Sequence, residues 1–162
     1  MSGWAEHRAS GAPRSAEIPE PAFTLEVARR MVPLVQRIIH DLLVAQKRVV
    51  SLRHEKRRLE QRRHLLAWPD RRRRYCLEEE LAEQLDNLHD ALAELEVLGL
   101  VLFDRRTGRV GFPTHLHKRR GFFVWQPGDE TVRYWRYAGD RALRTIPSNW
   151  LTPKVLEAVR QA

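Results

Sequence analysis

Apolar residues recur at alternating steps of three and four along two neighbouring stretches of the chain, a pattern typical of helices that pack along one face. The first stretch predicts a long helix over 25–66, with a heptad seam interrupted only at Lys56 and Arg63. The second predicts a shorter helix over 76–98. Together they predict an antiparallel, coiled-coil-like helical hairpin. The seam residues are Val35, Ile38, Leu42, Ala45, Val49, Leu52, Leu59 and Leu66, and then Leu81, Leu85, Leu88, Leu92 and Leu95.

Proline and glycine mark the expected ends of these helices. Pro69 has no N–H and disfavours helical geometry at Trp68, so we expect the first helix to end there. Gly99 adopts a left-handed conformation without penalty and is expected to end the second helix. Pro33 lies inside the first helix and predicts a kink or a restart. The hairpin is therefore predicted to occupy residues 23–99.

After Gly99 the apolar residues follow a period of two, which indicates strands. Four strands are predicted, over 100–103, 109–112, 121–125 and 131–137, with a basic loop at 114–120 and a Pro-Gly turn at 127–128. They form a four-stranded antiparallel meander over 100–138, which is too small to be stable alone and must pack on the helices. The predicted fold class is therefore α+β.

The two ends of the chain predict less regular structure. Residues 1–22 are rich in Ala, Ser, Gly and Pro and are expected to form a disordered leader. Residues 139–162 are expected to form a loop and then a short helix. This helix begins at Thr152-Pro153, an N-cap residue followed by proline in the first turn, and ends at Arg160.

The first predicted helix is much longer than the second, so its N-terminal part must bury an apolar face elsewhere. This face includes Leu25, Met31, Val35, Ile38 and Leu42. Two hosts are available, the β module of the same chain and a second copy of the protein. We expect both to contribute and favour a dimer in which these residues take part in self-association.

The two helices carry opposite charge. Residues 23–68 contain 11 Lys and Arg against 4 Asp and Glu, a balance of +7, whereas residues 76–99 contain 8 acidic residues and no Lys or Arg, a balance of −8. The cations of the first helix are therefore interpreted mainly as a face that pairs with the second helix. The alternative interpretation is a stripe that binds nucleic acid.

Two further groups of cations point to anionic partners, as does the net charge of +8. Four consecutive arginines at the predicted hairpin tip form either a solvated turn or a contact to phosphate on RNA, DNA or a lipid head group. In the β module, aromatic residues alternate with cations, which predicts either packing residues fringed by solvated arginines or a platform for stacking bases. The candidate residues are Arg71, Arg72, Arg73 and Arg74 at the tip, and Arg119, Arg120, Trp125, Arg133, Trp135 and Arg136 in the β module.

A set of residues between Phe23 and Asp140 carries a family resemblance. The set comprises Phe23-Thr24-Leu25-Glu26, Pro33, Leu95 to Gly99, Asp104, Thr107-Gly108, Val110, Phe112-Pro113, Trp125, Gly128, Val132 and Trp135. It resembles the bacterial domain-of-unknown-function 2203 family, a resemblance that implies no established activity. The resemblance also implies Asp before Phe-Pro, Glu after the turn glycine and His after the second tryptophan, where this chain has Gly111, Asp129 and Arg136. A metal or proton-transfer role of that Asp and His would not extend to this chain.

The sequence predicts no catalytic residues, no metal ligands and no cofactor. His115 and His117 flank Leu116 in a basic segment, without Cys or acidic partners at metal-site spacing. The lone Cys76 excludes an intrachain disulfide framework and fits a reducing, cytoplasmic compartment. The longest uncharged apolar run, over 98–103, is too short to span a membrane.

These observations predict a non-enzymatic interaction or scaffold protein that self-associates through its helical hairpin. The alternative is an RNA- or DNA-binding accessory protein, for example one associated with the ribosome. It would use the arginine-rich tip and the basic aromatic face of the β module.

Overall fold

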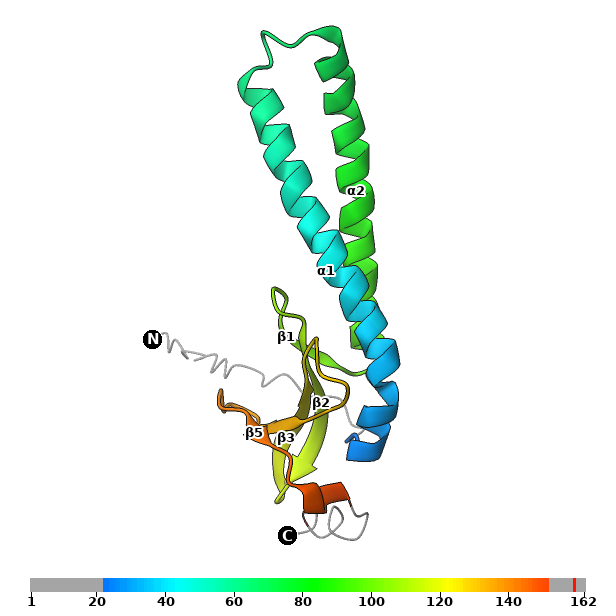
Figure 1. Ribbon diagram of the computed structural model, residues 1–162, viewed down its shortest axis with the longest axis vertical. Helices are drawn as coiled ribbons and strands as arrows, with labels where there is room; N and C mark the ends of the chain where they lie inside the picture. Colours follow the sequence, from blue (N-terminus) through cyan, green and yellow to red (C-terminus); the bar gives the residue numbers. More distant parts are fainter. Residues whose placement is uncertain (1–21, 152–158, 160–162) are drawn as a thin grey trace, which may run out of the picture.

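The computed structural model describes residues 22–151 and residue 159. Two long helices, α1 (Leu25–Gln61) and α2 (Trp68–Val97), lie side by side and project from a small β-sheet (Figure 1). The sheet contains β1 (Val101–Asp104), β2 (Arg109–Leu116), β3 (Arg119–Trp125), β4 (Tyr134–Tyr137) and β5 (Arg144–Thr145). Each strand pairs in antiparallel fashion with the next, and a 3-10 turn, η1 (Ser148–Leu151), follows.

The predicted α+β class is confirmed, with five strands instead of four. The strand that was not predicted, β5, has only two residues, too few for a period of two to be recognised. The predicted leader lies outside the described residues except for residue 22. The predicted C-terminal helix also lies outside them, apart from Val159.

Two predicted boundaries near prolines are wrong. The first helix ends at Gln61 and not at Leu66, and the second begins at Trp68 and not at Cys76. Pro69 therefore lies in the first turn of α2, where its missing N–H would have had no helical partner. Within α1, by contrast, the helix continues through Pro33 without a restart.

The strand β2 likewise continues past Pro113, where it was predicted to end. The carbonyl of Pro113 accepts a 2.8 Å hydrogen bond from the Phe23 N–H, so this edge of β2 faces the chain before α1 and not β3. The nitrogen of Pro113 faces the same edge. The pairing of β1 with β2 ends at Val101 and Gly111, so no strand lies opposite this nitrogen and no hydrogen bond of the sheet is lost. The predicted loop at 114–120 is a tight hairpin, in which His117 and Lys118 form the turn with φ of 51° and 57°.

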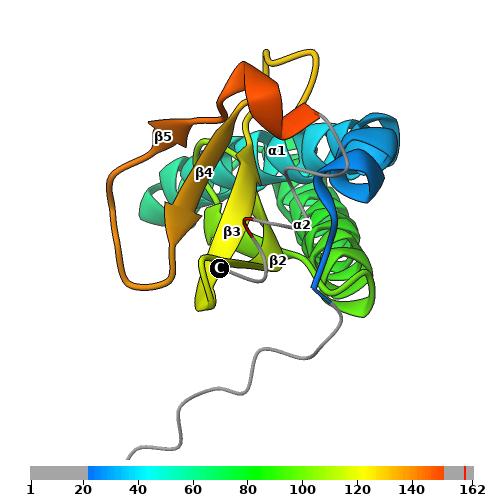
Figure 2. The ribbon, with the colours of Figure 1, turned by 90° about the horizontal axis from the view of Figure 1, so that it is seen from below.

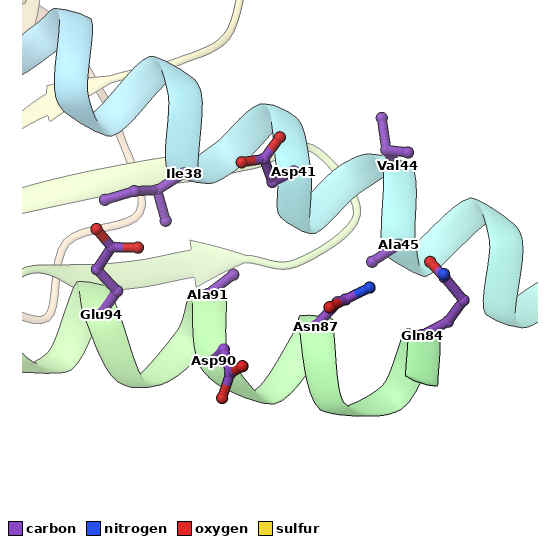
Figure 3. Close-up of a pocket in the computed structure, with 9 residues that line it drawn as sticks. All are labelled: Ile38, Asp41, Val44, Ala45, Gln84, Asn87, Asp90, Ala91 and Glu94. Carbon is purple, nitrogen blue, oxygen red and sulfur yellow. The ribbon is translucent and has the colours of Figure 1, made fainter. Parts of the chain in front are cut away.

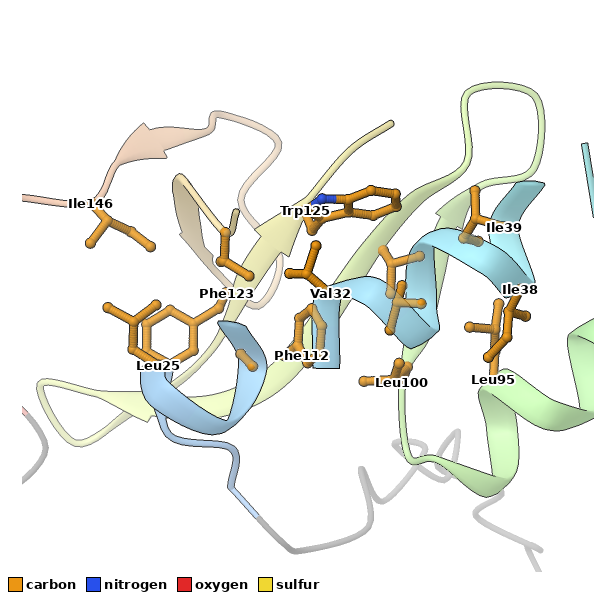
Figure 4. Close-up of a cluster of buried hydrophobic side chains, with 14 of the residues drawn as sticks. Leu25, Val32, Ile38, Ile39, Leu95, Leu100, Phe112, Phe123, Trp125 and Ile146 are labelled. Atoms are coloured by element: carbon orange, nitrogen blue, oxygen red, sulfur yellow. The ribbon is translucent and has the colours of Figure 1, made fainter. Parts of the chain in front are cut away.

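The core lies between one face of the sheet and the N-terminal half of α1, with the end of α2 beside it (Figures 2 and 4). Strand alternation directs Val110, Phe112, Phe123 and Trp125 inward onto this helix. The buried side chains of the cluster are those of Leu25, Ala28, Val32, Val35, Ile38, Ile39, Leu42, Ala91, Leu95, Leu100, Val110, Phe112, Leu116, Phe123, Trp125, Val132, Ile146 and Trp150.

The five residues predicted to take part in self-association are in this region. Leu25, Val35, Ile38 and Leu42 are buried in the core of their own chain, and Met31 packs against it. The β module, one of the two hosts expected for this face, therefore covers it. A contact between copies would have to use other side chains of the hairpin.

The loop between β1 and β2 attaches the sheet to the middle of α1. Asp104 accepts hydrogen bonds from the Arg106 N–H and the Thr107 hydroxyl, and these bonds hold the pKa of Asp104 below its ordinary value. The loop closes at Gly108, which has a φ of +73°. A Cβ at this position would lie 2.6 Å from Ile39 Cγ2, so the backbone of the loop packs directly on α1.

Replacing Gly108 with Ala tests this contact. Gly128 provides the matched control, because its φ is +98° and nothing lies within 4 Å of a Cβ built on it. We expect Gly128→Ala to cost about 1 kcal/mol of unfolding free energy, from backbone strain alone. Gly108→Ala should cost about 3 kcal/mol, because the added methyl group also displaces Ile39. Urea unfolding of both variants measures the difference, and equal losses would show that the loop does not pack closely on the helix.

Candidate nucleic-acid interface

An aromatic and basic stripe lies at the start of α2, at the tip of the hairpin. Trp68 and Tyr75 are seven residues apart, two helical turns, and so share one face of the helix. They are 73% and 67% exposed. Arg71 and Arg72 lie between them on the same face and are also exposed. We call Trp68, Arg71, Arg72 and Tyr75 the tip stripe.

The contacts of these arginines leave most of their donors free for a ligand. Arg71 Nε donates to the Leu66 carbonyl at 3.1 Å, which fixes the base of its guanidinium. Arg74, which lies outside the stripe, has its guanidinium carbon 5.9 Å from the centre of the Tyr75 ring. Among the described residues, Arg72 has no hydrogen bond or ion pair from its side chain. The stripe therefore presents cations and flat rings to solvent at the same place.

Electrostatics at this end of α2 favour an anion. Residues 57–75 contain eight arginines against Glu60 and Asp70, a local balance of +6. The positive end of the α2 dipole adds to this charge, and the N-cap residue Ala67 provides no side-chain oxygen for the free N–H groups. Cations in the first turns of a helix are unfavourable, so a bound anion would stabilise this arrangement.

Arg73 points away from the tip stripe and joins the two helices. Its Nε lies 2.8 Å from Glu55 Oε1 on α1, and its Nη1 lies 2.6 Å from Glu80 Oε1 on α2. Arg73 was one of the four arginines predicted to form a solvated turn or a contact to phosphate, and it instead pairs with carboxylates of both helices. The hydrogen bond from Arg73 is the main reason that the pKa values of Glu55 and Glu80 lie below their ordinary values.

The predicted charge pairing between the helices is confirmed at two other positions. Arg48 contacts Glu80 at 2.8 Å, and Lys56 contacts Glu78 at 3.2 Å. The basic residues of α1 closer to the tip form no such bridge to α2 within the described part of the chain. Pairing therefore accounts for the middle of α1, whereas the tip keeps an excess of positive charge.

The aromatic platform predicted in the β module is not a single surface. Trp125 is only 1% exposed and donates its indole N–H to the Asp129 carbonyl, so it is a core residue and cannot stack on a base. Trp135 faces the same side of the sheet and packs against Tyr137 and Trp150. Of the two interpretations of these aromatics, Trp125 follows the first, a packing residue. The sequence left this open because alternation separates the two faces of a strand but does not tell which face is covered.

The arginines predicted in the β module are divided in the same way. The guanidinium of Arg119 lies 4.0 Å from the centre of the Tyr137 ring on the inner face, and Arg133 pairs with Asp129 at 4.0 Å. Arg120 and Arg136 lie on the outer face, opposite His115 and Phe122 in the strand register. The structure does not bring these side chains together with the hairpin tip (Figure 1).

Sequence reasoning missed Trp68 and Tyr75. Trp68 was read as the residue at which the first helix ends, so its place on the face of the second helix was not considered. The signal that could have identified both is their spacing of seven on either side of the arginine run.

A groove between the helices has a different character. Its volume is about 340 Å³, and its polar lining includes Asp41, Asp90 and Glu94 (Figure 3). The carboxylates diverge, because Asp90 points away from α1. Within 22–151 and at residue 159, no group of three or more His, Cys, Asp or Glu side chains is arranged to hold a metal ion. Neither long helix contains a segment apolar enough to cross a membrane.

The fold and surface define a small α+β protein with a basic, aromatic tip on a projecting hairpin. The chain belongs to the family described as an uncharacterized conserved protein (DUF2203), whose model matches residues 22–141. This segment includes both helices, the tip stripe and the strands β1 to β4. No curated protein and no solved structure matches the chain.

The Arg73 ion pairs predict a specific dependence of stability on pH. Because Glu55 and Glu80 have lowered pKa values in the folded protein, their contribution is present above the pKa of unfolded glutamate, about 4.3, and is lost as the pH falls through the folded values. Arg73→Gln should therefore lower the Tm at pH 7, and its Tm should approach that of the native protein at about pH 3. Calorimetry at both pH values measures this change.

Arg72→Gln is the control, because it removes an arginine of the same helix that has no carboxylate partner in the described structure. Its effect on Tm should be small at both pH values. A Tm difference for Arg73→Gln that stays constant from pH 7 to pH 3 would contradict the assigned ion pairs.

Proposed function

We propose that the protein is a non-enzymatic binding protein that holds single-stranded nucleic acid at its hairpin tip. The observation that carries this proposal is the tip stripe, in which two exposed aromatic rings flank exposed arginines. Proteins that bind single strands without reading their sequence combine cations along the backbone with aromatic side chains on which bases stack. A cytoplasmic location, which the lone cysteine favours, agrees with this partner.

The dimensions of the stripe suit a short segment of a strand. Seven residues of α-helix separate Trp68 from Tyr75 by about 10 Å along the axis. Stacked bases are about 3.4 Å apart, so this distance corresponds to about three nucleotide steps. Arg71 and Arg72 lie between the rings, where they can contact the phosphates of the same segment. The uncapped start of α2 adds a favourable potential for those phosphates.

Substitution of the two aromatic residues tests stacking. Trp68→Ala combined with Tyr75→Ala should weaken the binding of a single-stranded RNA by about tenfold or more, because base stacking is worth about 1–3 kcal/mol per base. The slope of log affinity against log salt should change little, because no charge is removed. Fluorescence anisotropy across a salt series measures both quantities.

Substitution of arginines should have the complementary effect. Arg71→Gln with Arg72→Gln should reduce the salt slope by about 0.7 for each phosphate contact that is lost. Arg105→Gln with Arg106→Gln, which removes two exposed arginines from the loop between β1 and β2, is the control and should leave the slope unchanged. No binding at low salt, or equal losses in both arginine variants, would refute the proposed site.

Self-association through the hairpin is a second candidate, supported by apolar side chains that the β module does not cover. Val50 is 63% exposed and Leu85 is 36% exposed, and both line a groove beside the loop of β1 and β2. The side-chain oxygen of Gln46 in this groove is buried and has no hydrogen-bond partner in the described structure. A helix of a second copy, packed as in a coiled coil, would cover these side chains.

Val50→Glu combined with Leu85→Glu tests this second candidate. The two charges should shift a dimer toward monomer in sedimentation experiments at micromolar concentration, because burying unpaired carboxylates is costly. Val97→Glu is the control, because Val97 is exposed at the end of α2 and outside the groove. A dimer that the double variant leaves intact would argue against this surface.

A further inference from the structure

The outer face of the sheet, the face away from the helices, carries two half-buried guanidinium groups. Arg109 comes from β2 and Arg136 from β4, with β3 between these strands. Arg136 is opposite Phe122 in the register, and its guanidinium carbon lies 3.8 Å from the centre of the Phe103 ring on β1. The Arg136 side chain therefore extends across the sheet toward β1.

A missing side chain on β2 makes room for this arrangement. A Cβ at Gly111 would lie 2.4 Å from Phe103 Cζ, so the Phe103 ring rests on the bare backbone of β2. There it meets Phe122 edge to face, with the ring centres 5.1 Å apart. The two rings form an apolar support beneath the Arg136 guanidinium. The guanidinium carbon also lies 5.9 Å from the centre of the Phe122 ring.

The donors of the two guanidiniums are largely unsatisfied. The Nε atoms of Arg109 and Arg136 are buried and have no hydrogen-bond partner in the described structure. The one side-chain hydrogen bond of either group within the described residues joins Arg109 Nη2 to Gln126 Oε1 at 3.3 Å. Neither arginine forms a salt bridge with a carboxylate of the described residues.

The positive charges of the two arginines make their lack of partners more unfavourable. Burial and then the positive charge of Arg109 lower the pKa of Arg136 from its ordinary value, and the negative charge of Asp140 opposes them to a smaller extent. Two cations on one face of the sheet, each with a buried Nε–H that has no partner, are unfavourable, because no hydrogen bond compensates for the loss of water. A ligand that carries negative charge and several acceptor oxygens would compensate for this loss of water.

We propose that Arg109 and Arg136, supported by Phe103 and Phe122, form a binding site for a terminal phosphate group. A phosphate monoester carries a charge of about −1.5 to −2 at pH 7 and has three acceptor oxygens, which matches two guanidiniums better than a single carboxylate does. The site is on the sheet and does not depend on nucleic acid binding at the hairpin tip. Its ligand can be a small phosphate ester or the phosphorylated end of a nucleic acid, which share this chemistry.

Nitrogen-15 NMR of the arginine Nε–H groups in the full chain tests the site. Inorganic phosphate, titrated at constant ionic strength against chloride, should shift the Nε–H signals of Arg109 and Arg136 in a saturable manner. Arg136→Gln should weaken this binding about tenfold or more, because a charge-assisted hydrogen-bonding partner is lost. Arg136→Lys keeps the charge but not the planar guanidinium group. Its affinity for phosphate should lie between those of the native chain and Arg136→Gln.

Arg133→Gln is the matched control, because Arg133 directly precedes β4, the strand that contains Arg136, but is paired with Asp129. It should bind phosphate as the native chain does. Shifts with phosphate no larger than those with chloride, or an equal loss in Arg133→Gln, would overturn the proposal. The native titration needs no variant, so a variant that fails to fold does not remove the test.

Two further ligands distinguish the sources of the phosphate. Glycerol phosphate represents a small ester, and a 5′-phosphorylated oligonucleotide, compared with its 5′-hydroxyl form, represents a nucleic acid end. Tighter binding of either phosphorylated ligand than of its unphosphorylated counterpart, at the Arg109 and Arg136 signals, supports the site. Indifference of those signals to phosphorylation in both pairs would overturn it, whatever the result at the hairpin tip.

Discussion

The packing of the sheet on the N-terminal half of α1 is the interaction on which the rest of the structure depends. Neither part has a sufficient core alone. Only Leu77, Ala91 and Leu95 are buried in α2, and a sheet of short strands needs a partner on one face. Phe112 and Trp125 provide that contact from the sheet, and α1 covers them. Each part therefore stabilises the other, and the hairpin is packed most fully at its base.

The distal half of the hairpin is held differently. Val49, Leu52 and Leu77 form a narrow apolar seam, and ion pairs such as Arg48 with Glu80 lie at the surface beside it. Surface ion pairs contribute little stability each. The seam can hold the two helices side by side, but no other element of the described structure packs on this part of the hairpin. This design places the tip far from the core, where aromatic side chains stay exposed and cations are not neutralised by the rest of the fold.

Periodicity in the sequence was sufficient to predict the helices, the sheet and their order, because steps of three and four or of two reflect which side of an element is covered. The errors near Pro69 and Pro113 have one cause. Proline was taken as a terminator in both cases, yet each proline stands where its missing N–H loses no hydrogen bond. Whether that holds depends on the neighbouring element, which a local pattern does not contain.

The candidate sites were less predictable for a related reason. Composition identified an excess of arginine but not which arginines have partners. Arg73 pairs with two carboxylates from different helices, whereas Arg72 next to it faces solvent. Likewise Trp125 and Trp68 are the same residue type, but Trp125 is buried in the core and Trp68 is exposed. These distinctions come from tertiary packing.

The unpaired arginines occupy two environments, and the environments imply different ligands. At the tip the cations are exposed, so their attraction for a polyanion is long-ranged but strongly screened by salt. On the outer face of the sheet, Arg109 and Arg136 are half-buried, and Arg136 rests on an aromatic support, so salt screens their charges less. Binding at the tip should therefore depend steeply on salt and on the length of the strand. Binding at the proposed site on the sheet should depend on the ionisation of a single phosphate group, so the two proposed activities can be separated in one protein.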